Sequence, residues 1–255
     1  MLKRLLLYLN SKVAQTLPPD IVQKSMAANW KNQWSEWRPD QMYPDTHAQR
    51  EAFLAKRFEP TLSRESCIVE LGCANARYLL KIAPGIKKAY AFDISPTFLQ
   101  TAKDCARERG ITNVTFIERD LQQWINKPDG LPDIEKRLSG AINDDDWEIT
   151  HVFVGALLMY FAKDEDALKM FAVCNRLLPK TGHLLLRETL VKDGLSRKIH
   201  SAAEGYMAIY RTYEEYRAMI EQAGFKIECD DAIGHEKDTC HHSFLCSKIT
   251  DTAGH

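Results

Sequence analysis

Glycine and acidic residues stand at the ends of three apolar runs, where their chemistry suits an adenosine. The first run ends in Glu70-Leu71-Gly72, the second ends at Asp93, and Asp120 closely follows the third. A glycine there lets the chain turn sharply and lets a ligand approach the backbone. A carboxylate 21 residues after Gly72 can accept from both ribose hydroxyls, and Asp120 can accept from a purine amine. Each acid alone could cap a helix. A glycine or an acid at each of three successive strand ends, however, predicts an adenosine-containing ligand.

The residues after Gly72 discriminate between adenosine ligands. A dinucleotide needs Gly-x-Gly-x-x-Gly so that its pyrophosphate can approach the turn, whereas this chain has Ala74 and Ala76 close behind a lone glycine. A pyrophosphate would crowd against the two methyl groups, and a smaller ligand without phosphates would not. The Gly-x-x-x-x-Gly-Lys-Ser/Thr pattern is also absent from the sequence. A nicotinamide-dependent oxidoreductase and a nucleoside triphosphatase are therefore disfavoured.

Strands that alternate with helices would bring these residues to one edge of a sheet. From about residue 66, short apolar runs alternate with segments whose apolar residues lie three and four apart, which predicts a parallel sheet with helices on both faces. The expected strands are Cys67–Leu71, Lys88–Phe92, Val114–Ile117, Thr150–Val154 and His183–Leu186, with helices Ala76–Ile82, Pro96–Arg109 and Asp164–Leu178 between them. Ligands bind such sheets at the carboxyl ends of the strands.

The remaining segments complete this organisation. Residues 1–60 are expected to form a helical extension or lid, and residues 61–255 the ligand-binding domain. The hydrophilic stretch Asn126–Trp147 is expected to be a solvated loop. A last helix, Thr212–Ala223, should precede a closing strand pair, Phe225–Cys229 and His242–Cys246.

From about residue 66 to 248 the chain resembles the class I S-adenosylmethionine-dependent methyltransferases. Glu70 and Gly72 match the family motif Glu/Asp-x-Gly-x-Gly-x-Gly, from which Ala74 and Ala76 depart. The resemblance implies a doubly wound, mostly parallel seven-stranded Rossmann-like sheet and S-adenosylmethionine as cofactor. It also implies cofactor contacts by Glu70, Gly72, Cys73, Ala74, Asn75, Asp93, Ile94, Asp120, Leu121 and Gly155.

Candidate residues for the methyl acceptor follow the later strands. Glu188 is expected at the pocket mouth, where it would orient or deprotonate an acceptor, or else form a surface charge paired with Arg187. Tyr160 is expected as a pocket aromatic or as a core residue. Aromatic rings and a guanidinium that suit a sugar or an anion are expected from a segment with helical spacing, which alternatively packs in the core; its residues are Tyr206, Tyr210 and Arg211.

The reaction expected from these residues is methylation of a small molecule or glycan at a hydroxyl. An amine of a peptide or metabolite is the alternative acceptor, and a non-catalytic S-adenosylmethionine-binding protein is the alternative class. Nucleic acid is disfavoured as a partner, because the formal net charge is -1. The stretch Gly155-Ala156-Leu157-Leu158 also stands where base-amino methyltransferases carry Asn/Asp-Pro-Pro-Tyr/Phe.

Cysteines and termini indicate the compartment. The count of seven cysteines is odd and no Cys-x-x-Cys occurs, which is typical of reduced thiols in a cytoplasmic protein. Cys240-His241-His242 lacks a second ligand pair, so no metal site is expected. Apolar runs of about 5 to 7 residues fall short of the roughly 20 that span a membrane. Met1–Leu9 could form a basic amphipathic helix that packs on the protein or a second subunit, or lies on a membrane surface; no pattern sets the oligomeric state.

Overall fold

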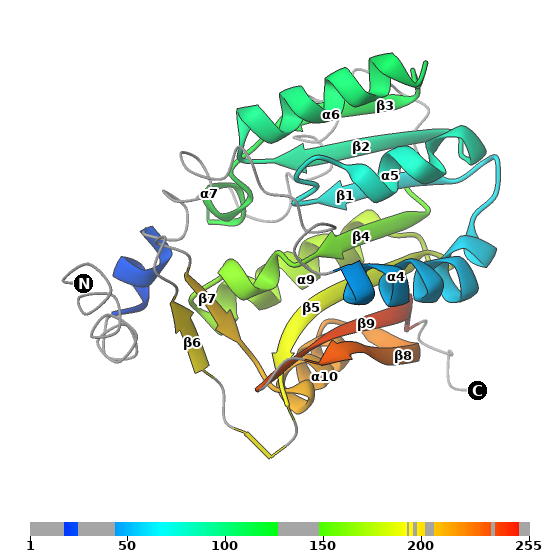
Figure 1. Ribbon diagram of the computed structural model, residues 1–255. Helices are drawn as coiled ribbons and strands as arrows, with labels where there is room; N and C mark the ends of the chain where they lie inside the picture. Colours follow the sequence, from blue (N-terminus) through cyan, green and yellow to red (C-terminus); the bar gives the residue numbers. More distant parts are fainter. Residues whose placement is uncertain are drawn as a thin grey trace.

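A seven-stranded sheet forms the centre of the computed structural model, which describes residues 18–24, 44–126, 148–192, 194–195, 198–201, 207–235 and 238–249. The strand order is β3-β2-β1-β4-β5-β9-β8 (Figure 1). The first five strands in this order are parallel, and β9 and β8 are antiparallel. The strands are β1 Cys67–Leu71, β2 Lys88–Asp93, β3 Val114–Glu118, β4 His151–Gly155, β5 His183–Val191, β8 Phe225–His235 and β9 Thr239–Lys248. The predicted doubly wound, mostly parallel sheet is confirmed.

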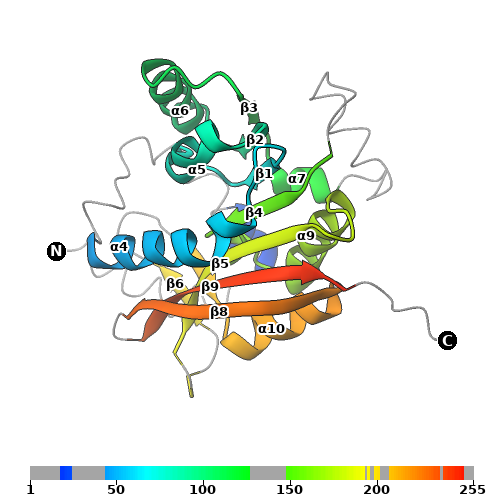
Figure 2. The same ribbon diagram turned by 90° about the vertical axis from the view of Figure 1, so that its right-hand side faces the viewer.

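Helices cover both faces of the sheet (Figures 1 and 2). They are α4 Pro44–Phe53, α5 Arg77–Ile82, α6 Pro96–Glu108, α7 Leu121–Ile125, α9 Asp164–Leu177 and α10 Tyr213–Gln222. One apolar core joins the sheet to α7, α9 and α10, and a second joins it to α4, α5 and α6. Alternation along β1 divides the two cores, because Val69 packs in the first and Ile68 in the second.

Local sequence sets several helix starts. Ser95 accepts a hydrogen bond from Phe98 N, and Pro96 occupies the first position of α6. Thr212 and Glu215 form a reciprocal capping box at the start of α10. These starts place α6 directly after β2 and α10 directly after the short β6–β7 pair, Lys198–Ser201 and Met207–Tyr210. Part of the aromatic segment with helical spacing therefore forms a strand.

Part of the expected N-terminal extension packs on the sheet. α4 continues into a π-helical turn, Leu54–Phe58, and buries Phe53, Leu54 and Phe58 in the second core. Residues 19–24 form a helical turn whose Val22 packs against Ile209 of β7. The predicted helix Met1–Leu9 and all of the predicted loop Asn126–Trp147 except Asn126 lie outside the described residues. Among those described, no helix is long and apolar enough to cross a membrane.

The strand order reverses beside β1. From β1 the chain continues outward to β2 and β3, and then returns to the other side of β1 as β4. The loops after β1 and β4 therefore follow the switch point of the strand order, at the carboxyl edge where doubly wound sheets bind ligands.

Candidate functional site

The turn after β1 has the backbone conformation of a glycine-rich loop although it contains two alanines. Gly72, Ala74 and Ala76 have φ angles of 76°, 47° and 50°. Gly72 N and Cys73 N both donate to Phe92 O of β2, at 2.8 and 2.9 Å. Left-handed backbone costs an alanine roughly 1–2 kcal/mol, so these contacts hold the turn against local preference. Ala74 and Ala76, which replace the family glycines, thus both adopt the left-handed conformation.

Asp93 ties this turn to the end of β2. Its Oδ2 accepts from Ala74 N at 2.7 Å, and its Oδ1 accepts from Ser95 N at 2.8 Å. The carboxylate is buried, which raises its pKa, while backbone N–H groups oppose the increase. Each carboxylate oxygen can accept more than one hydrogen bond, so Asp93 keeps acceptor capacity for the two hydroxyls of a ribose.

Asp120 follows the neighbouring strand β3 and caps α7. Its Oδ1 accepts from Gln123 N at 3.0 Å, which is the helix-cap role that the sequence left open. Its other oxygen has no hydrogen bond among the described residues. Arg119 N donates to Asp93 O at 2.8 Å, so the two acidic loops are directly connected. Leu121 is buried at the start of α7, and Ile94 is half-buried.

Glu70 carries an unpartnered oxygen beside the turn. The residue is buried, and its Oε2 has no hydrogen-bond partner in the described part of the chain. Burial raises the pKa of Glu70 to about 8, while the charge of Arg187 lowers it and that of Asp93 raises it. Buried polar atoms almost always have a partner. An ammonium group of a ligand would supply one, so Glu70 fits the methionine amine of S-adenosylmethionine.

The loop after β4 meets the turn after β1. A Cβ atom on Gly72 would lie 3.1 Å from Leu157 Cδ1, so the two loops pack directly together. Gly155 ends β4, and a Cβ atom there would lie 3.0 Å from Arg187 Nη2. Glycine at the two positions therefore lets Leu157 and Arg187 approach the backbone closely.

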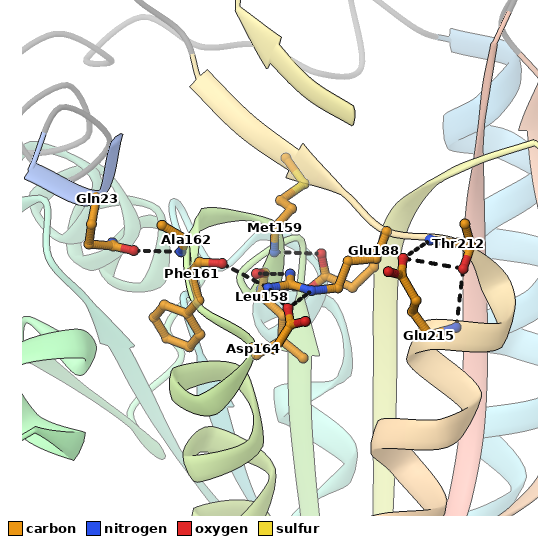
Figure 3. A network of polar contacts seen from close by, with 10 residues as sticks. Gln23, Leu158, Met159, Phe161, Ala162, Asp164, Glu188, Thr212 and Glu215 are labelled. Atoms are coloured by element: carbon orange, nitrogen blue, oxygen red, sulfur yellow. Dashed lines mark hydrogen bonds and ion pairs between the residues drawn. The ribbon is translucent and has the colours of Figure 1, made fainter. Parts of the chain in front are cut away.

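Glu188 does not lie at the pocket mouth, and it is not a surface partner of Arg187. Its side chain is 1% exposed and points to the short helical turn Leu158–Tyr160 (Figure 3). Oε1 accepts from Leu157 N and Leu158 N at 2.9 and 2.8 Å, and Oε2 accepts from Met159 N at 3.2 Å. Burial raises the pKa of Glu188 to about 7, although the hydrogen bonds from these three N–H groups lower it. The prediction of its position is wrong, because the carboxylate holds the β4 loop.

Arg211 is likewise occupied within the protein. Its side chain is fully buried; Nη1 and Nη2 donate to Leu158 O and Phe161 O, both at 2.8 Å, and Nε donates to Asp164 Oδ1 at 3.0 Å. Figure 3 labels the three residues that accept these hydrogen bonds, Leu158, Phe161 and Asp164. The predicted anion fork therefore binds backbone carbonyls and a helix terminus, so the expectation that it binds substrate is wrong.

The predicted tyrosines have different environments. Tyr210 is buried in a small apolar cluster with Met159 and Val191, as the packing alternative expected. Tyr160 is half-buried at the edge of this cluster and stays a candidate for the pocket. Tyr206 lies outside the described residues.

Several residues of the site carried no sequence signal. Gln23 brackets the end of the β4 loop, since its Nε2 donates to Tyr160 O at 2.9 Å and its Oε1 accepts from Ala162 N at 2.7 Å. Arg187 lies beside Glu70, and Arg50 lies beside Arg187; neither arginine forms an ion pair with an acid among the described residues. Their positions depend on contacts across more than 100 residues, which local spacing does not encode.

Comparison with known proteins agrees with this geometry. A family model described as a methyltransferase domain matches residues 62–224. A curated relative from Mycobacteroides abscessus, 2-heptyl-1-hydroxyquinolin-4(1H)-one methyltransferase, is 39% identical over 57 residues, which are 22% of this chain and 25% of that protein. The match thus spans about a quarter of the relative's length.

Two solved structures share the fold at low identity. Phosphoethanolamine N-methyltransferase 1 of Haemonchus contortus, in complex with phosphoethanolamine and S-adenosylhomocysteine, aligns with a TM-score of 0.67 and 15% identity over 94% of this chain and 52% of that one. The [4+2]-cyclase SpnF aligns with a TM-score of 0.61 and 15% identity over 94% and 96% of the two chains.

Proposed function

Because the chain belongs to the class I S-adenosylmethionine-dependent methyltransferase family, we propose that it transfers the methyl group of S-adenosylmethionine to a hydroxyl of a small molecule or glycan. The observation that carries the proposal is the Asp93 carboxylate, which two backbone N–H groups hold between the β1 turn and the start of α6. In that position it retains acceptor capacity for a ribose. The family supplies the identity of the donor.

The bound donor would supply an electrophilic methyl group on a sulfonium sulfur. The residues of this chain would hold and orient it: Asp93 by the ribose hydroxyls, and Glu70 Oε2 by the methionine ammonium. Leu157, packed over Gly72, would exclude water beside the turn. Alignment and exclusion of water are the main contributions that a protein makes to such a displacement.

What the described residues leave available supports one class of acceptor. A hydroxyl must lose its proton as it attacks, so it needs a base or must be acidic itself. Glu188 cannot act as that base while it accepts three backbone N–H groups. An acidic hydroxyl, such as a phenol or an N-hydroxy heteroaromatic, therefore fits best. The curated relative, whose name specifies a ring hydroxyl, supports this choice.

The test is a turnover assay with methyl-labelled S-adenosylmethionine. Separate panels of acidic hydroxyl compounds, saccharides and primary amines are incubated with the full chain, and products are identified by mass. Label on a hydroxyl supports the proposal, and label confined to amines would move the acceptor to nitrogen. Binding of S-adenosylhomocysteine without turnover of any panel would favour a non-methylating protein, a class that the cyclase with the same fold makes concrete.

Asp93→Ala provides the matched test of the donor site. Losing two hydrogen bonds to the ribose should weaken S-adenosylhomocysteine binding by about 2 to 4 kcal/mol, measured by calorimetric titration. Asp104→Ala, an exposed change on α6, serves as the control and should leave the affinity unchanged. Equal affinities of Asp93→Ala and the native chain would place the adenosine elsewhere.

A further inference from the structure

Three buried polar atoms without partners lie on the side of the sheet that α4 covers. Among the described residues, Arg50 Nε, Glu70 Oε2 and Ser243 Oγ are buried and make no hydrogen bond. Buried polar groups in folded proteins are nearly always paired, and each exception calls for a bound group or an ordered water. Three exceptions on the face that α4 covers call for a partner that the described residues do not supply.

Strand register explains why these atoms come together. Arg187 of β5 is directly opposite Ser243 of β9, and Thr189 is opposite His241, so all four side chains point to one face. On the same face, Glu70 of β1 is in register with Phe153 of β4. Arg187 bridges the two sets, because its guanidinium carbon lies 5.5 Å from the centre of the Phe153 ring.

Helix α4 closes this layer from above and contributes Arg50. The helix lies over the β5–β9 part of the sheet in Figure 2. The neighbouring Gln49 anchors it, since its Oε1 accepts from Gly234 N of β8 at 2.8 Å. We call Arg50, Glu70, Arg187, Thr189, His241 and Ser243 the α4 polar layer. Arg187 of this layer packs against Gly155 at the end of β4, so the layer adjoins the carboxyl edge of the sheet.

The acids near the two arginines do not pair with them: Glu51, whose charge raises the pKa of both, lies 2.7 Å from Lys81 Nζ, and Glu70 Oε2 has no partner among the described residues. The guanidinium of Arg187 is the main cause that lowers the pKa of Arg50 to about 9, and burial is the second cause. Neither arginine forms an ion pair within the described residues. His241 adds no charge near neutral pH, because burial and then the two arginines lower its pKa to about 4, and its Nδ1 lies 3.0 Å from Thr189 Oγ1. The missing partner is therefore an anion.

We propose that the α4 polar layer binds an anionic oxygen group of the methyl acceptor, a carboxylate or a phosphate monoester. Guanidinium groups bind both in paired hydrogen bonds, and Ser243 Oγ and Thr189 Oγ1 add hydroxyls. This inference rests on the proposed function, because it names the substrate class of that same site.

The donor cannot balance the layer by itself. S-Adenosylmethionine carries an ammonium, a carboxylate and a sulfonium, so it enters with one net positive charge. If Glu70 pairs with the ammonium, one carboxylate remains for two guanidinium groups, and the sulfonium adds further positive charge nearby. An anionic acceptor supplies the charge that is still missing and is drawn towards the methyl group by the same field.

The experiment measures anion binding to the protein saturated with S-adenosylhomocysteine. Inorganic phosphate and acetate are titrated by calorimetry into the native chain, Arg187→Gln, Arg50→Gln and Arg57→Gln. Arg57 lies on the exposed side of the π-helical turn that continues α4 and is the matched control. We expect at least a tenfold loss of phosphate or acetate affinity in the first two variants and none in Arg57→Gln. Arg187→Lys, which keeps the charge, should show an intermediate loss, and circular dichroism confirms folding.

Two outcomes would overturn the proposal. Equal or absent anion binding in all the proteins would assign the layer to water and structure. A loss of S-adenosylhomocysteine affinity in Arg187→Gln, with 5′-methylthioadenosine affinity retained, would assign the arginines to the donor carboxylate, because methylthioadenosine lacks the amino acid. Failure of the native chain to bind S-adenosylhomocysteine would instead contradict the proposed function, so the two failures are distinguishable.

Discussion

At the scale of single residues, Ala74 and Ala76 show how tertiary contacts override local preference. Both adopt left-handed φ angles that glycine adopts freely. The price of this strain is offset by bonds that cross strands, including Ala74 N to Asp93 Oδ2 and Cys73 N to Phe92 O. The turn therefore depends on β2 being in place.

Replacing Ala74 by glycine should relieve this strain. The change removes roughly 1–2 kcal/mol of left-handed cost and adds roughly 0.5–1 kcal/mol of unfolded-chain entropy, for a net stabilisation of about 0.5–1 kcal/mol. Denaturant unfolding measures the difference. Ala218→Gly, at an exposed position within α10, is the control of opposite sign and should destabilise by about 1 kcal/mol. A less stable Ala74→Gly protein would contradict this account.

Glu70 should make stability depend on pH. Its pKa is about 8 in the folded protein against an ordinary value of 4.5, so the folded state holds a proton that the unfolded chain releases. The free energy of unfolding should therefore fall as pH rises from about 4.5 to about 8. In Glu70→Gln the free energy of unfolding should fall less over this pH range, by on the order of a few kcal/mol. Denaturant midpoints at pH 5 and pH 8 measure it.

The exposed Glu65 supplies the control for that measurement. Glu65→Gln should follow the native pH curve throughout. Parallel curves for Glu70→Gln and the native chain would mean that Glu70 already has a partner in solution, and the assignment of an ammonium to Oε2 would then lose its basis.

At the scale of elements, the β4 loop is held from both sides by charged groups. Glu188 of β5 accepts its N–H groups, and Arg211 donates to the carbonyls of Leu158 and Phe161. Val191 N also donates to Arg211 O at 3.1 Å, which joins β5 to the start of α10. The loop that borders the candidate site is thus fixed by β5, α9 and the segment before α10.

Arg211→Met should destabilise the protein by about 3 kcal/mol, because it leaves two buried carbonyls and Asp164 without their donor. Arg217→Met is the matched control, since Arg217 forms only exposed ion pairs with Glu214 and Glu221 on α10. That change should cost about 0–1 kcal/mol. Thermal unfolding of the two variants measures both. Similar losses in the two would show that Arg211 does not hold the loop.

The positions of Glu188 and Arg211 also show where prediction from sequence ends. Short apolar runs predicted the five parallel strands and the residues at their ends, because strands buried on both faces, as β1 and β4 are, leave a local signature. The polar pair Arg187-Glu188 suggested that β5 ends at Leu186. In the structure β5 continues to Val191, where it pairs with Thr239 of β9. That pairing is not encoded in the local sequence. Because β5 continues as a strand, the Glu188 side chain points to the core that contains α9 and α10, and the Arg187 side chain points to the α4 side.

At the scale of the whole molecule, the described segments that precede the sheet cover the side where we propose that the acceptor binds. α4 closes the polar layer above β5 and β9, and residues 19–24 lie beside β7 and the start of α9 (Figure 1). Lys163, just before α9, adds an ion pair with Asp20 at 2.7 Å. The residues proposed to hold the donor, by contrast, end or follow β1, β2 and β3. Apart from Glu70, which both proposed sites share, the two sites draw on different parts of the chain.

This division predicts that Gln23→Ala loosens the β4 loop without weakening donor binding. The change removes both hydrogen bonds that bracket the end of the β4 loop, at Tyr160 O and Ala162 N, so hydrogen exchange of residues 158–162 should accelerate about tenfold, equivalent to roughly 1.4 kcal/mol. The affinity for S-adenosylhomocysteine should stay within twofold, because Asp93 and Glu70 are untouched. Lys24→Ala, next along the chain and exposed, is the control for both measurements. Faster exchange at the β1 turn, or weaker donor binding, would show instead that the N-terminal turn supports the whole crevice.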